Sequence, residues 1–295
     1  MIGRAALAAT AAICVAVVCG GGLAPVGPAQ AQGLDLGRKD NKPIEVYAED
    51  GIEWDQKDKR YVARGKARAI QGDTTVHADT LIAHYEEKKG KGSAIYRIDA
   101  VGNVRIVSPN QTVYGDRGVY DARQKILVLT GRKLRLVTKD EIVTARDSLE
   151  YYDDKSLAVA RGNATMRQRQ PEKGKERTVR ADVLTSQSPP KGGKDGGGRA
   201  GNKAVPRRMD AYGNVVITRP GEIALGERGF YLPDQEIAEL WGKVRITRDK
   251  NQLNGERAVV NFKTGLSRLL AGKGQGRTPP VRVLIVPDTG PAESP

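Results

Sequence analysis

The sequence has few of the residues from which catalytic or metal sites are built. Among its 295 residues are two cysteines and two histidines, and both cysteines, Cys14 and Cys19, lie in the first 20 positions. Without that segment the chain has no thiol for a disulfide or a thiolate metal site. His77 and His84 flank Asp79, and an isolated His–Asp pair near a turn is more typical of surface hydrogen bonding than of catalysis. We therefore predict no catalytic residue, no metal and no cofactor, and hence no enzyme.

A long apolar run occurs once, at 5–18, after the single positive charge of Arg4. Glycines, prolines and the small-residue site 29–31 follow it. This order predicts a secretory signal at 1–31, cleaved after Ala31. The alternative is a retained anchor, since a 20-residue stretch is just long enough to span a bilayer.

Charge of one sign dominates the rest of the chain. After the signal, 48 basic residues stand against 35 acidic ones, a net charge of +13. Such an excess predicts an anionic partner. Because an exported protein meets little nucleic acid, we exclude nucleic acid and expect phosphorylated lipid, acidic glycan or a membrane surface.

One short phrase recurs seven times: an acidic residue, usually an aromatic four to six positions later, then a glycine that starts a stretch of alternating residues. Successive glycines are separated by 37, 29, 31, 51, 29 and 30 residues. The two long intervals contain insertions, at 86–93 and 187–208, and without them the period is near 30, as in repeat arrays. We assign the acids and glycines to turns. The glycines are Gly65, Gly102, Gly131, Gly162, Gly213, Gly242 and Gly272, and the acids 15 residues before their glycine are Asp50, Asp116, Asp147 and Glu227.

Apolar and polar residues alternate after the glycines, as at 102–107 and 242–247. Period two, rich in Val, Ile and Thr, predicts half-buried strands, and no stretch shows a helical period. We expect two or three strands of about five residues per unit, roughly 14 to 18 in all, in a solenoid-like stack of about seven units. The side chains expected to face inward are Val104, Ile106, Leu134, Leu136, Val215, Ile217, Val244 and Ile246. Those expected to face outward are Arg68, Arg105, Arg135 and Arg245.

The repeated frame resembles the LptA/OstA family of periplasmic lipopolysaccharide-transport proteins over about 44–270. The residues that carry the resemblance are Ala78-Asp79 with Tyr85, Gly115-Asp116 with Tyr120, Gly226-Glu227 with Tyr231, Gly255-Glu256 with Phe262, and the Gly-Asn-Val strands at Gly102 and Gly213. The resemblance implies an elongated, twisted β-jelly roll, open along one side and apolar inside. Domains of this kind join end to end between the inner and outer membranes.

For function, the resemblance implies a non-enzymatic periplasmic bridge that carries the acyl chains of lipopolysaccharide in an apolar groove. The eight inward residues above would line the groove, and the four arginines would attract anionic headgroups. Partners would be an inner-membrane LptC-like and an outer-membrane LptD-like domain, joined through end-to-end strand pairing, with self-association as a further expectation. The inward residues could equally pack against the opposite sheet in a closed core.

We divide the chain into a signal at 1–31, a disordered linker at 32–43, a jelly roll at 44–272 and a tail at 273–295. A basic disordered insertion is expected at 187–208, and a strand is allowed at 281–286. Two other interpretations stay open: a structural or glycan-binding β-solenoid, and a membrane-anchored LptC-like relative.

Overall fold

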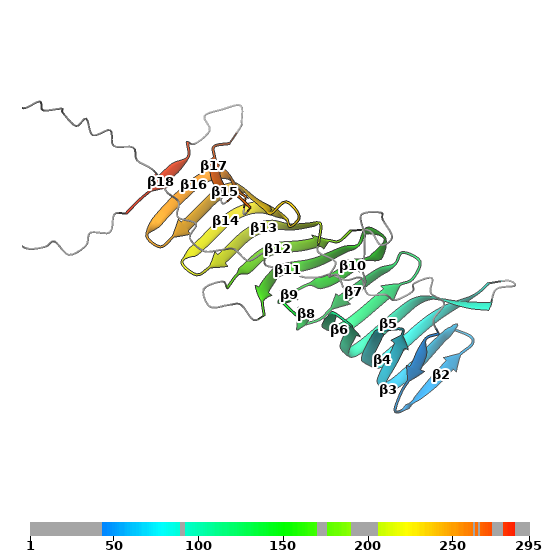
Figure 1. Cartoon of the computed structure of the whole chain (residues 1–295). Coiled ribbons are helices and arrows are strands. Elements are labelled where there is room, and N and C mark those ends of the chain that lie inside the picture. The colour runs from blue at the N-terminus through cyan, green and yellow to red at the C-terminus, as the bar shows by residue number, and fades with distance from the viewer. Residues whose placement is uncertain are drawn as a thin grey trace, which may run out of the picture.

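The computed structural model describes residues 43–88, 92–169, 176–189, 206–261, 263–264, 266–272 and 280–286. It is an all-β, elongated and twisted jelly roll whose strands follow one another along a single axis (Figure 1). The predicted signal, the middle of the basic insertion and most of the tail lie outside the described residues. Within the described ranges, no helix is long and apolar enough to cross a membrane.

Eighteen strands form one antiparallel sheet. The first nine are β1 (Glu45–Tyr47), β2 (Gly51–Asp55), β3 (Arg60–Gln71), β4 (Thr74–Lys88), β5 (Gly92–Ser108), β6 (Gln111–Asp121), β7 (Ile126–Thr130), β8 (Leu134–Thr138) and β9 (Glu141–Ala145). The others are β10 (Ser148–Tyr152), β11 (Leu157–Gln168), β12 (Thr178–Gln187), β13 (Arg208–Arg219), β14 (Glu222–Leu232), β15 (Ile237–Arg248), β16 (Asn251–Asn261), β17 (Leu266–Leu270) and β18 (Arg282–Leu284). A short 3₁₀ turn, Asp153–Lys155, precedes β11.

Most strands pair with the next one in the chain. In the middle of the molecule, β7 and β8 share the edge of β6, and β10 and β9 together pair with β11. At the two ends, a long strand is again covered by two short ones: β1 and β2 lie on β3, and β17 and β18 lie on β16. Figure 1 shows β2 and β3 at one end of the row and β16 to β18 at the other.

The expectation of strands of about five residues is wrong for most of the sheet, because the repeat glycines lie inside long strands. At Gly102 φ is +78°, and at Asn103 φ is +46°. Two successive left-handed residues create a bulge, and the register of β5 and β6 shifts between Val101 and Val104. The strand therefore turns a corner without ending. Gly65, Gly162, Gly213 and Gly242 lie at equivalent corners.

Each corner glycine is packed against a carboxylate of a neighbouring strand. The space that a Cβ on Gly102 would need is taken by the side chain of Asp79. That carboxylate also accepts a hydrogen bond from Asn103 Nδ2, at 2.9 Å. The same contact recurs in five other pairs, which agrees with the interpretation of these acids as framework: Asp50–Gly65, Asp116–Gly131, Asp147–Gly162, Asp182–Gly213 and Glu227–Gly242.

Because the long strands bend at these corners, the sheet forms two walls that face each other. Wall A contains Ala69, Val76 and Ile106; wall B contains Leu81 and Tyr120, and side chains of both walls belong to one apolar cluster. A second cluster, formed by β12 to β16, continues the interior toward the carboxyl end.

Candidate functional site

The two walls meet at the corners, where the interior is closed. Val104, Leu134, Val215 and Val244 are each 1–2% exposed. A Cβ on Gly226 of wall A would lie 2.6 Å from Cγ of Leu240 of wall B. Four of the eight predicted groove residues thus form a tightly packed floor, and in this respect the closed-core interpretation holds for part of the interior.

Above the floor, wall A carries a second apolar row. It contains the other four predicted residues; Ile106 is 2% exposed, whereas Leu136, Ile217 and Ile246 are half-buried against the core. The strand register places these four in line with eight further residues, namely Ala69, Val76, Val113, Val143, Met166, Val179, Ala224 and Leu253. This continuous middle row is the apolar surface of wall A nearest to the open side.

Wall B faces this row with aromatic and aliphatic side chains. Ile98, Tyr120 and Leu127 are aligned across β5, β6 and β7, and Tyr231 pairs with Met209 farther along. The repeat aromatics served only to recognise the motif in the sequence; the structure places two of them, Tyr120 and Tyr231, on the interior of wall B. Their spacing from the corner acids was the signal that could have identified them.

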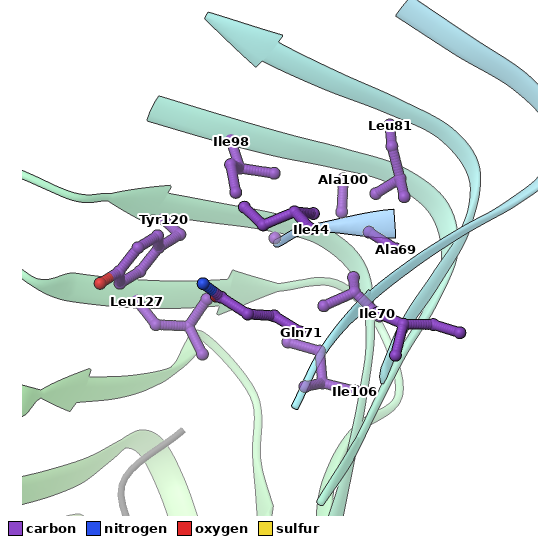
Figure 2. A pocket seen from close by; sticks show the side chains of 12 residues that line it. Ile44, Ala69, Ile70, Gln71, Leu81, Ile98, Ala100, Ile106, Tyr120 and Leu127 are labelled. Atoms are coloured by element: carbon purple, nitrogen blue, oxygen red, sulfur yellow. The ribbon is translucent and has the colours of Figure 1, made fainter. Parts of the chain in front are cut away.

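A hollow separates the walls near the amino-terminal end. It encloses about 490 Å³, including the space at its open mouth. Figure 2 shows side chains of both walls converging on it, with Ile44 entering just before β1 and Gln71 lying alongside Leu127. The lining is almost wholly apolar: Ile44, Ala69, Ile70, Gln71, Val76, Leu81, Ile98, Ala100, Ile106, Gly118, Tyr120 and Leu127.

The four predicted outward arginines are exposed on the outer face of wall A: Arg68, Arg105, Arg135 and Arg245. The guanidinium of Arg68 lies 4.6 Å from the ring centroid of Tyr47, and that of Arg135 lies 4.5 Å from the ring of Tyr114. These arginines are separated by the sheet from the apolar rows.

The histidines do not form the His77–Asp79 pair considered from the sequence. Asp79 packs on Gly102, and His77 lies between Arg68 and Arg105 in the ladder. Partial burial lowers the pKa of His77, and the two neighbouring guanidinium groups act in the same direction.

His84 instead lies beside the carboxylate of Asp99. The Nε2 to Oδ2 distance is 3.2 Å, and Arg97 donates two hydrogen bonds to the same carboxylate at 2.8 and 2.7 Å. Hydrogen bonding from Arg97 lowers the pKa of Asp99 despite its burial. The described part of the chain holds no group of three or more His, Cys, Asp or Glu side chains placed to share a metal ion.

Apolar side chains are exposed at both ends of the row of strands. On β2, Ile52 is 52% and Trp54 is 56% exposed. At the other end, Leu266 of β17 is 49% and Ile285, just after β18, is 66% exposed. Both ends of the sheet therefore present apolar side chains on short strands.

Comparison with known proteins supports the resemblance inferred from the repeat. Residues 46–147 match the family model described as LptA/(LptD N-terminal domain) LPS transport protein. This range includes the first two corner glycines and the hollow near Ile106. The chain thus contains a segment of the lipopolysaccharide-transport type, and the family interpretation is confirmed over that range.

Two individual proteins are also similar. An uncharacterized protein of Rhizobium meliloti (strain 1021) is 27% identical over 134 residues, which cover 43% of this chain and 69% of that protein. A solved structure is LptH of Pseudomonas aeruginosa, described as the LptA-homologous periplasmic component of a conserved lipopolysaccharide transport device. It is 15% identical and covers 83% of this chain and 96% of its own, with a TM-score of 0.21, too low to support an argument.

Proposed function

We propose that this chain is a non-enzymatic periplasmic carrier that holds the acyl chains of lipopolysaccharide between walls A and B and passes the lipid from the inner toward the outer membrane. The observation that carries the proposal is the apolar hollow between the walls, which continues into the middle row. The match of residues 46–147 to a lipopolysaccharide-transport domain supplies the ligand class.

The energetics favour an apolar lining over a polar one. A chain of about twelve carbons gains roughly 0.8 kcal/mol for each CH₂ removed from water, on the order of 9 kcal/mol in total. That gain is realised only where the contact is dry and continuous. The middle row provides an unbroken line of aliphatic side chains, and Tyr120 and Leu127 of wall B cover it from the other side.

For transfer, we propose end-to-end contacts with an LptC-like domain, an LptD-like domain and further copies of this chain. Short terminal strands leave backbone groups that can pair with another strand. The exposed Trp54 at one end and Ile285 at the other would be covered in such a junction. The orientation of the chain between the membranes is left to experiment.

A photo-crosslinking experiment tests the ligand site. A photoreactive amino acid at the half-buried Leu136 or Ile246 should capture lipopolysaccharide in cells, because both positions belong to the middle row. Their sequence neighbours Arg135 and Arg245 lie on the outer face and are the matched controls. Equal labelling at inner and outer positions, or none at either, would contradict the proposal.

A further inference from the structure

The upper edge of wall A carries a row of polar residues on its inner face. The strand register aligns one polar side chain from each half-strand, two positions beyond the middle row. In order, these are Gln71, Thr74, Ser108, Gln111, Thr138, Glu141, Gln168, Arg177, Arg219, Glu222, Arg248 and Asn251. We refer to these twelve residues as the polar row.

The two ends of the polar row differ in charge. Its first five members are neutral and hydrogen-bonded among themselves; the hydroxyl oxygens of Thr74 and Ser108, for example, are 3.2 Å apart. Charged side chains begin at Glu141, which is 1% exposed. The molecule thus places charge inside its trough only in the carboxyl-terminal part of the polar row.

Two arginines of this charged part are direct neighbours. Because Thr178 pairs with Thr218 and Val179 with Ile217, Arg177 stands opposite Arg219. Both share the inner face with Val179 and Ile217, since side chains alternate along a strand. Like charges directly opposite each other are destabilising, so this pair favours an anion between them.

The surroundings of Arg177 are dry. Burial lowers the pKa of this guanidinium, and the charge of Arg219 acts in the same direction, whereas Glu141 and Tyr231 oppose the shift. Tyr231 comes from wall B, and its pKa in turn is lowered by Arg177 against a larger rise due to burial. The tyrosine hydroxyl therefore lies near the arginine pair across the trough.

The other charges of the polar row are largely matched. Arg248 Nε donates to Glu222 Oε2 at 2.9 Å. This pairing assigns one carboxylate to one arginine and leaves Glu141 as the acidic neighbour of the two remaining arginines. A bound dianion would reverse the local excess of positive charge.

We propose that Arg177, Arg219 and Tyr231 form a binding site for the phosphate monoester of an amphiphile whose acyl chains lie on the middle row. This site rests on the proposed function, because its ligand is anchored in the same trough. Guanidinium groups bind phosphate through paired hydrogen bonds, and the tyrosine hydroxyl supplies a further donor. The outer arginines cannot serve the same molecule, because the sheet separates them from its chains.

The experiment compares two ligands with the same acyl chain, lysophosphatidic acid and monoacylglycerol, by calorimetric titration of the full chain. Arg177→Gln and Arg219→Gln should each weaken binding of the phosphorylated ligand about 10-fold and leave the neutral ligand unchanged. Arg180→Gln is the matched control, because Arg180 is exposed on the outer face of the same strand and should change neither affinity. Arg177→Lys, which keeps the charge but loses the paired donors, should fall between the wild type and Arg177→Gln.

The outcomes separate this proposal from the broader one. If the wild-type chain binds both ligands equally, or if Arg180→Gln weakens phosphate binding as much as Arg177→Gln, the headgroup site is wrong while the trough remains. If neither ligand binds, the trough itself is wrong. Inorganic phosphate that binds as tightly as lysophosphatidic acid would indicate a free-phosphate site and overturn the assignment to a lipid. The wild-type comparison does not depend on how any variant folds.

Discussion

Replacing Gly102 with alanine should destabilise the sheet through two separable effects. The residue has φ = +78°, and a left-handed conformation costs an L-residue about 1–2 kcal/mol. The new Cβ would also collide with the carboxylate of Asp79, whose Cγ lies 2.8 Å from the Cβ position. Moving that carboxylate breaks its bond with Asn103, which contributes about 0.5–1.5 kcal/mol. We expect a total loss of about 2–3 kcal/mol in the free energy of unfolding.

Gly118→Ala is the matched control. Gly118 lies on the neighbouring strand β6 and has an ordinary φ, and a Cβ there would lie 3.5 Å from Val104 Cγ1 and 3.7 Å from Ala100 Cβ. These are normal packing distances. Because glycine inside a strand is less favourable than alanine by about 0.5–1 kcal/mol, this substitution should leave stability unchanged or raise it slightly.

Urea unfolding followed by circular dichroism measures both variants, and a constant m-value shows that the same transition is being compared. Adding Asp79→Ala separates the two effects. In that background Gly102→Ala should cost only the backbone strain, since the carboxylate and its hydrogen bond are already absent, so the two substitutions should be less than additive by about 1 kcal/mol. Strict additivity, or a Gly102→Ala effect no larger than that of Gly118→Ala, would refute the corner mechanism.

Three other substitutions test the remaining parts of the structure. Asp99→Asn should lower stability at neutral pH; because Arg97 holds the pKa of Asp99 below its ordinary value near 4, the wild-type advantage is present above about pH 4 and should shrink as acid unfolding curves are taken to lower pH. Trp54→Lys should reduce self-association in sedimentation velocity, whereas Ile223→Lys, which changes a residue 46% exposed in the middle of the chain, should behave as wild type; equal effects would contradict an end-to-end junction. Leu129→Ala should cost about 2–5 kcal/mol in urea, since Leu129 is 1% exposed; a loss below 1 kcal/mol would contradict a tightly packed interior.

The repeat predicted the class of structure because its information is local. Alternation of residues such as Val104, Arg105 and Ile106 determines which side chains share a face, and the structure buries the first and third while exposing the second. The acids and glycines likewise act over short distances, as neighbours across one bent hairpin. The number of strands, 18, lies within the expected range.

Strand length was missed because the glycine signal is ambiguous. A glycine between two alternating segments is compatible with a turn or with a bulge inside one strand. The pair of positive φ values at Gly102 and Asn103 selects the bulge, and this conformation is held by the carboxylate of Asp79 on the neighbouring strand. At Gly131 the outcome differs, since this glycine does separate two strands, β7 and β8.

The sequence by itself determined the all-β class, the repeated corners and the inner or outer side of most strand residues, because each depends on a short period along the chain. Only the tertiary structure decided which predicted residues form the closed floor and which form the middle row. It also decided that Arg177, Arg219 and Tyr231 meet. The first two belong to no recurring motif, and they face each other because the bulges and insertions set the register between distant strands, which is a long-range property of the chain.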